Sequence, residues 1–168
     1  MADTKTSALT ALTGMALTDK LYVSNSGTDK HIDFDDFSET GTFTPVIGDG
    51  TNNYTLSAAS GFYARSGKLI TVSVRVTWSS IGSASGILRL DGLPYNGANI
   101  SNYRAGVSLS DVSGIDTSGG KQIIGRLTAN TDYIQFYLIN DNSSRSNVLS
   151  ENSSSAGTLD LSISYQAA

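Results

Sequence analysis

Residues 70–78 alternate strictly between apolar and polar side chains, which is the pattern of a β-strand with one buried face. The apolar positions are Ile70, Val72, Val74, Val76 and Trp78, and the polar positions are Thr71, Ser73, Arg75 and Thr77. The apolar set predicts a strand face that lies in a hydrophobic core, with Trp78 closing one edge of that core. The polar set holds one arginine among small hydroxyl residues, so this second face could meet water, another subunit or a ligand.

The same alternation returns from Gly41 to the C-terminus. The inward sets of two further strands are Ile134, Phe136 and Leu138, and Leu159, Leu161, Ile163 and Tyr165. Shorter strands are predicted at residues 41–50, 54–56, 62–64, 87–90, 103–112 and 121–127, and polar loops at residues 79–86, 91–102 and 141–157. The strand at 41–50 is expected at a sheet edge because Pro45 lacks an N–H. About eight strands without an amphipathic helix predict an all-β, antiparallel β-sandwich of jelly-roll type.

Residues 1–40 lack the repeated long strands that are predicted from Gly41 onward. Short strands at residues 21–23 and 30–34 flank a glycine-containing turn, which predicts a small hairpin. Asp33 is expected to cap a short helical turn, with Asp35 and Asp36 in its positive first turn. This segment is too small to bury a core of its own and is expected to need a partner surface. We therefore divide the chain into residues 1–40 and a sandwich domain at residues 41–168.

The composition excludes several classes of protein. The chain has 168 residues, no cysteine and a formal net charge of -4. The missing cysteines exclude disulfides and thiolate metal sites. The negative charge argues against a nucleic-acid partner. No run approaches the ~20 apolar residues that a membrane-spanning helix needs, so we expect no membrane insertion.

The residues that carry most catalytic chemistry are sparse. His31 is the single histidine, and the G-x-S-x-G pattern of a nucleophilic serine is missing. The cluster Asp33, Asp35 and Asp36 offers oxygen ligands for calcium, but it lacks the glycine and terminal glutamate of an EF-hand and is better explained by helix capping. The remaining carboxylates considered, which fall mostly in predicted loops, are Asp91, Asp111, Asp116, Asp132, Asp141 and Glu151. Nothing in the sequence pairs them, so we expect neither an enzyme nor a cofactor or metal site.

Tyrosines are the remaining functional signal. Tyr95, Tyr133 and Tyr137 are the candidates for contact with a glycan, because a tyrosine ring offers both an apolar face and a hydrogen bond. Tyr133 and Tyr137 share the strand face opposite Ile134, with Gln135 between them. Binding of a sugar, contact with a subunit and plain exposure are three alternatives for that face.

Two sets of motifs resemble bacteriophage proteins. Residues 41–45 read G-T-F-T-P, an aromatic and a glycine turn at residues 63–67 precede a long strand, and residues 86–95 read G-x-L-x-L-x-G-L-P-Y. This order resembles a module of tailed-bacteriophage virion proteins. Residues 11–37 contain a Leu-Thr start, D-x-L-x-V, a polar turn and K-x-I-x-x-x-D-F, and are similar to attachment segments of phage fibre-like proteins.

The resemblance implies a homotrimer that carries β-sandwich heads on the surface of the virion, made in the host cytoplasm and bound to other proteins of the capsid or tail. It implies that residues 1–40 attach the protein through Leu9, Leu12, Leu17, Leu21, Tyr22, Ile32, Phe34 and Phe37. A shaft, which fibres place between attachment segment and head, has no counterpart around residues 38–41. This departure favours a squat knob.

These observations give two functional hypotheses. The leading one is a structural knob that decorates or cements the capsid through its N-terminal segment. The alternative is a short tail fibre or receptor-binding protein that recognises host surface polysaccharide. In either case we expect Arg75, together with Thr71, Ser73 and Thr77, to lie at a subunit interface.

Overall fold

The computed structural model describes residues 20–25, 28–33, 38–140 and 145–168. The chain divides into two compact units, Met1–Glu39 and Thr40–Ala168. In the first unit β1 (Lys20–Asn25) and β2 (Thr28–Asp33) form an antiparallel hairpin that sets Leu21 opposite Ile32 and Tyr22 opposite His31. The other expected attachment residues, Leu9, Leu12, Leu17, Phe34 and Phe37, lie outside the described residues, as does the helical turn expected after Asp33.

The remaining strands form one ten-stranded sheet. They are β3 (Ser38–Phe43), β4 (Val46–Gly48), β5 (Thr55–Ser66), β6 (Leu69–Ser80), β7 (Arg89–Asp91), β8 (Arg104–Ile115), β9 (Gln122–Thr128), β10 (Ile134–Ile139), β11 (Arg145–Asn147) and β12 (Ser153–Gln166), with a short 3-10 helix at Ser150–Asn152. Their order is β3-β5-β6-β12-β8-β9-β10-β7-β4, and β11 pairs with β10.

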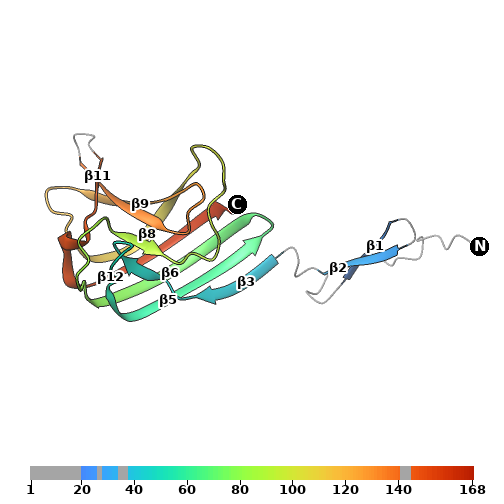
Figure 1. Ribbon diagram of the computed structural model, residues 1–168, viewed down its shortest axis with the longest axis horizontal. Helices are drawn as coiled ribbons and strands as arrows, with labels where there is room; N and C mark the ends of the chain where they lie inside the picture. Colours follow the sequence, from blue (N-terminus) through green and yellow to red (C-terminus); the bar gives the residue numbers. More distant parts are fainter. Residues whose placement is uncertain (1–19, 26–27, 34–37, 141–144) are drawn as a thin grey trace, which may run out of the picture. The chain divides into compact units, whose positions relative to one another are not determined.

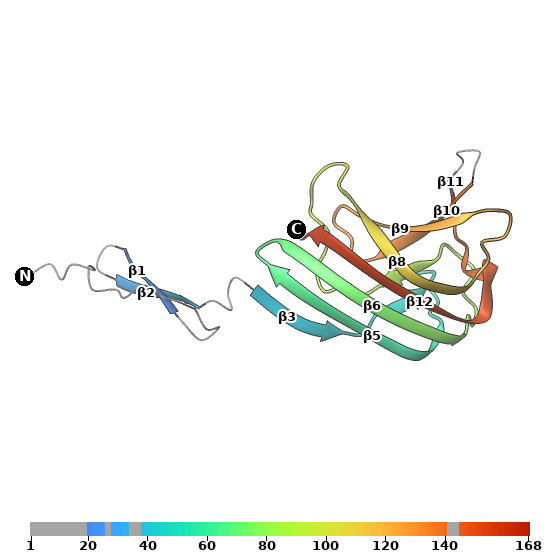
Figure 2. The same ribbon diagram turned by 180° about the vertical axis from the view of Figure 1, so that it is seen from behind.

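The sheet curls into two layers that face each other (Figures 1 and 2). One layer holds β3, β5, β6, β12 and β8, and the other holds β9, β10, β11, β7 and β4. β8 joins them, because Arg104, Ala105 and Gly106 pair with β9 while its later residues pair with β12. The strands of both layers pair antiparallel, so the predicted β-sandwich is confirmed.

The core lies between the two layers. Every member of the apolar set on β6, from Ile70 to Trp78, is at most 4% exposed, as the alternation predicts. The inward residues of β12 and of β10 are buried as well. Each fully buried side chain of this size contributes about 1.5–3 kcal/mol, so these facing sets supply the main driving force of folding.

Strand β5 corrects the sequence analysis, which predicted two short strands at residues 54–56 and 62–64. The structure has one strand, Thr55–Ser66, paired with β6 along its length and interrupted by register shifts near Leu56. The middle of β5 consists of small and polar residues, a composition that is typical of turns. Gly61 is needed there because an added Cβ would lie 2.5 Å from the Phe43 ring of β3. The neighbouring strands therefore impose an extended backbone that this segment does not specify by itself.

Other boundaries also differ from the predictions. The strand expected at 41–50 is two strands, β3 and β4, separated at Thr44 and Pro45, and these are the two edges of the sheet. The last strand begins at Ser153, inside the predicted polar loop, and β11 lies in that loop too. In the predicted loop, pairing of β11 with β10 and of β12 with its neighbours overrides the turn-forming composition.

Trp78 closes one end of the core. It is 1% exposed, its ring meets Tyr54 edge-on at 5.6 Å between centroids, and its indole N–H donates to the Ser154 carbonyl at 3.1 Å. Gly157, directly opposite Trp78 in the β6–β12 ladder, leaves room for the ring. A Cβ at residue 157 would lie 2.2 Å from Cζ2 of Trp78 and 2.4 Å from the Ser113 carbonyl oxygen.

Gly157→Ala is therefore expected to destabilise the protein by about 1–3 kcal/mol through overpacking. The control is Gly106→Ala, also in a strand, where an added Cβ meets nothing within 4 Å. That variant should stay within about 0.5 kcal/mol of the parent. Urea unfolding followed by tryptophan fluorescence measures both, and equal stability of the two variants would contradict the role of Gly157.

Candidate functional site

The outer face of β5, β6 and β12 carries ordered rows of short polar side chains. Across the β6–β12 ladder Thr71 faces Ser164, with their hydroxyl oxygens 3.0 Å apart, and Ser73 faces Ser162. Thr77 faces Thr158 in the same way. The four residues predicted for a subunit interface thus share one outer face, on which Thr71, Ser73 and Arg75 are exposed and Thr77 is half-buried.

A hollow of about 450 Å³ lies on this face. It is lined by Thr42, Ser60, Gly61, Phe62, Ser73, Val74, Arg75, Ser110, Asp160, Leu161 and Ser162. Serine and threonine hydroxyls supply most of its polar groups. The Phe62 side chain is 51% exposed, and Leu69, at the start of β6 on the same face, is 54% exposed. The face therefore combines hydroxyl groups with exposed apolar surface.

Charges meet in one row of this face. Arg75 lies opposite Asp160, with its Nη1 3.4 Å from Oδ2, and Asp160 lies opposite Asp111 of β8. The Arg75 side chain is 62% exposed, so this ion pair contributes little, about 0–1 kcal/mol. The other oxygen of Asp160, Oδ1, is buried and has no hydrogen-bond partner in the described structure. The row thus holds two carboxylates and one guanidinium, so negative charge is in excess. Oδ1 of Asp160 is a buried acceptor that receives no hydrogen bond from the described residues.

Asp160 is the charged residue of this site that the sequence does not single out. It occupies a polar position in the alternation of the last strand, as do Ser162 and Ser164. The pairing of Asp160 with Asp111 depends on a register shift between Asp160 and Leu161. Such a bulge cannot be predicted from the local sequence pattern. The structure also gives Arg75 a carboxylate within its own chain, where the sequence suggested a partner across a subunit interface.

The three candidate tyrosines belong to three separate clusters. Tyr95 meets the Tyr63 ring edge-on at 5.8 Å between centroids, and Arg65 lies over it. The guanidinium of Arg89 lies over the Tyr133 ring at 4.6 Å.

Tyr137 points outward from β10, as its position in the alternation predicts, but it is only 4% exposed. The guanidinium carbons of Arg126 and Arg145 lie 4.8 and 4.3 Å from its ring centroid, and Arg126 Nη2 donates to its hydroxyl at 2.9 Å. Stacking of this ring on a sugar, one of the sequence-based alternatives, does not fit this arrangement. The arginines, rather than the ring, are what the surface offers to a ligand.

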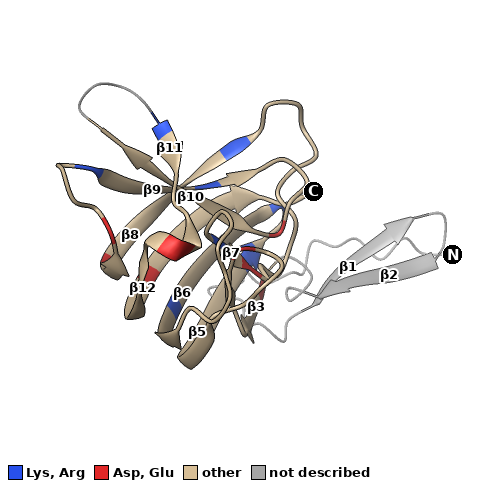
Figure 3. Cartoon of the chain, turned by 60° about the vertical axis from the view of Figure 1, so that its left-hand side comes forward, with Lys and Arg blue, Asp and Glu red and all other residues tan. Residues whose placement is uncertain are grey.

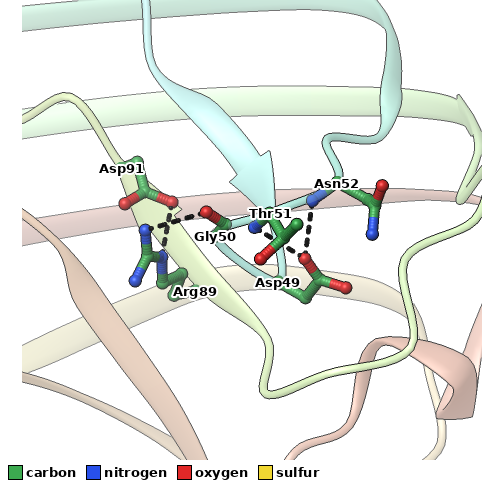
Figure 4. A network of polar contacts seen from close by, with 6 residues as sticks. All are labelled: Asp49, Gly50, Thr51, Asn52, Arg89 and Asp91. Carbon is green, nitrogen blue, oxygen red and sulfur yellow. Dashed lines mark hydrogen bonds and ion pairs between the residues drawn. The ribbon is translucent and has the colours of Figure 1, made fainter.

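The carboxylate of Asp49 connects two loops, and Figure 4 shows its contacts with Thr51 and Asn52 in the first of them. Its Oδ1 accepts the backbone N–H of Asn52 at 2.7 Å and of Thr51 at 2.8 Å, and its Oδ2 accepts those of Gly86 and Ser85. These four hydrogen bonds, that of Asn52 foremost, hold the pKa of Asp49 well below its usual range. The carboxylate thereby ties the β4–β5 loop to the β6–β7 loop.

Arg89 links the same region to the second layer (Figure 4). Its Nε donates to Asp91 at 2.9 Å, and its Nη2 reaches the Gly50 carbonyl at 3.5 Å. Burial raises the pKa of the Asp91 carboxyl, and the hydrogen bond from Arg89 opposes that shift. Together with its position over Tyr133, these contacts make Arg89 part of the framework rather than a free cation.

Within residues 20–25, 28–33, 38–140 and 145–168, no three His, Asp or Glu residues gather closely enough to hold a metal ion. In that same part of the chain no helix is long and apolar enough to cross a bilayer.

Comparison with known proteins finds a likeness among solved structures. No family profile matches the chain, and no curated protein matches it in sequence. Among solved structures it is similar to the crystal structure of the Dettilon tailspike protein, with a TM-score of 0.65 and 26% sequence identity. The match covers 77% of this chain and 24% of that protein, so the chain spans about a quarter of the length of the tailspike. This likeness supports, at a coarse level, a virion protein of a bacteriophage.

Asp49→Asn is expected to lower the melting temperature at pH 7, because an amide has one carbonyl oxygen where the carboxylate has two. The folded-state pKa of Asp49 lies below its unfolded value of 3.8, so its stabilisation is complete from about pH 5 upward and declines as the pH falls towards the folded-state pKa. The difference between parent and variant should therefore shrink between pH 5 and pH 2.5 in thermal melts. The exposed acid Glu151, changed to Gln, is the control, and a difference independent of pH would contradict the assignment.

Proposed function

We propose that the chain is a homotrimeric structural protein of a bacteriophage tail, attached through residues 1–40 and displaying residues 41–168 as a surface knob. The observation that carries the proposal is the likeness to a tailspike protein over 77% of this chain. The phage-like motifs at residues 11–37 and 41–95 agree with it.

The tail is preferred to the capsid as the place of attachment. The sequence alone favours decoration or cementing of the capsid, since no shaft separates the N-terminal segment from the knob. The solved structure to which the chain is similar is a tailspike, and this favours the tail.

The outer face of β5, β6 and β12 is the proposed surface of subunit contact. Its short side chains let a second backbone approach closely, and exposed Phe62 and Leu69 supply apolar surface for burial. The unpartnered Oδ1 of Asp160 would accept a hydrogen bond from a neighbouring subunit. Three copies placed around an axis would bury this face.

The proposed role contains no catalytic step. The structure brings Asp111 and Asp160 opposite each other, but both project from the same outer sheet face. A glycosidase instead needs carboxylates that flank the scissile bond from two sides.

Labelling of intact phage particles tests the placement. An antibody against the purified chain is expected to mark the tail in electron micrographs. Label on the capsid would overturn the tail placement in favour of decoration, and unlabelled particles would overturn a virion role altogether.

Ser73→Arg tests the subunit contact. The long side chain would fill the hollow and add a second positive charge beside Arg75, so the trimer is expected to dissociate in sedimentation-velocity runs. Ser101→Arg makes the same change at an exposed turn and should leave the trimer intact. Arg75→Ala should weaken the trimer as well. A parent chain that sediments as a monomer, or a trimer unchanged by Ser73→Arg, would refute this contact surface.

A further inference from the structure

The outer face of the second layer differs in character from the face with the hollow. Strands β9, β10 and β11 present Arg126, Tyr137 and Arg145 there, next to Gln135 and Asn147. Figure 3 shows the basic segment on β11, while acidic segments lie beside β8 and β12. Long side chains with nitrogen donors replace the short hydroxyls of the other face.

The two arginines are held in place by one aromatic ring. Arg126 comes from β9 and Arg145 from β11, strands that both pair with β10, which carries Tyr137. Their distances from the ring centroid, 4.8 and 4.3 Å, place the two guanidinium carbons at most 9.1 Å apart. The two positive charges are therefore no more than about one Debye length apart at moderate salt, and their repulsion is only partly screened. The ring offsets part of that repulsion by cation–π attraction.

Within residues 38–140 and 145–168 these charges have no carboxylate partner. Among the described residues neither Arg126 nor Arg145 has a carboxylate within ion-pair distance, whereas Arg75 and Arg89 each have one. Nε of Arg126 is shielded from water and has no hydrogen-bond partner in the described structure. A partly desolvated guanidinium attracts an anion more strongly than one in free solvent, because its field is screened less.

Amide groups extend this surface. Nε2 of Gln135 donates to Oδ1 of Asn147 at 3.3 Å, and Asn147 lies directly opposite Tyr137 in the ladder. Amides both donate and accept hydrogen bonds, which suits hydroxyl groups. A ligand that meets the whole surface would therefore carry a negative charge on a scaffold rich in hydroxyls.

We propose that Arg126 and Arg145, clamped on Tyr137, bind the anionic group of an acidic polysaccharide, while Gln135 and Asn147 meet its hydroxyls. The inference rests on the proposed function in one respect: a protein displayed on a virion meets polysaccharides of the host surface. It uses the layer opposite the proposed subunit contact, so both surfaces can be occupied at once.

Calorimetric titration of the full-length protein tests the proposal with three probes. An oligogalacturonate presents carboxylates, a poly(glycerol phosphate) presents phosphates, and a dextran oligosaccharide of similar length is neutral. We expect binding of an acidic probe that weakens as salt is raised, and no binding of the dextran. The stronger acidic probe identifies which anionic group is preferred.

Arg145→Gln is the main variant because Arg145 is exposed, so its loss should leave the fold intact. Removal of one charged hydrogen-bonding group is expected to weaken binding about tenfold. Arg126→Gln should do the same, with its melting temperature checked because Arg126 is half-buried. Lys68→Gln, at an exposed position of the turn between β5 and β6 in the other layer, is the control and should bind like the parent.

Binding of neither acidic probe, equal binding of the dextran, or affinities unchanged by Arg145→Gln would each overturn the inference. A protein that is trimeric and labels the phage tail, yet fails these titrations, would refute this site alone. A protein that binds the acidic probe but labels no particle would refute the proposed function instead.

Discussion

The ladder between β6 and β12 is the constraint on which the rest of the structure depends. It pairs ten consecutive positions, from Trp78 opposite Gly157 to Leu69 opposite Gln166. Because side chains alternate along both strands, one register brings apolar partners together on the inner face and polar partners together on the outer face. A slip by a single residue would reverse every one of these positions. The core, the Trp78 end and the row that holds Arg75 and Asp160 therefore follow from the same pairing.

The sequence predicts what depends on alternation and misses what depends on pairing. The inward sets of β6, β10 and β12 follow from a period of two, and each was assigned to the correct face. The middle of β5 and the start of β12 were missed because small and polar residues resemble turns until neighbouring strands hold them extended. The resemblance to phage virion proteins, in contrast, required only local motifs, and the likeness to a tailspike agrees with it at a coarse level.

The site residues show the same division. The outward direction of Thr71, Ser73 and Arg75 was predictable, but the contact between Arg75 and Asp160 joins residues 85 positions apart and needs the ladder. Likewise, the outward direction of Tyr137 is predictable from the alternation, but the two arginines that lie over its ring are not. Arg126 and Arg145 come from different strands, and only the assembled sheet brings them to one ring.

The position of β3 has a mechanical consequence. β3 and β4 are consecutive in sequence, yet they are the opposite edges of the sheet, joined through Thr44 and the buried Pro45. The N-terminal unit continues directly into β3, so any tension on residues 1–39 enters the knob at one edge strand. If β3 were pulled away, the chain would transmit the load to β4 in the other layer. If the protein is held through its N-terminal unit, as proposed, the load would be shared by both layers of the sandwich, and resistance to force would depend on peeling two edges rather than one.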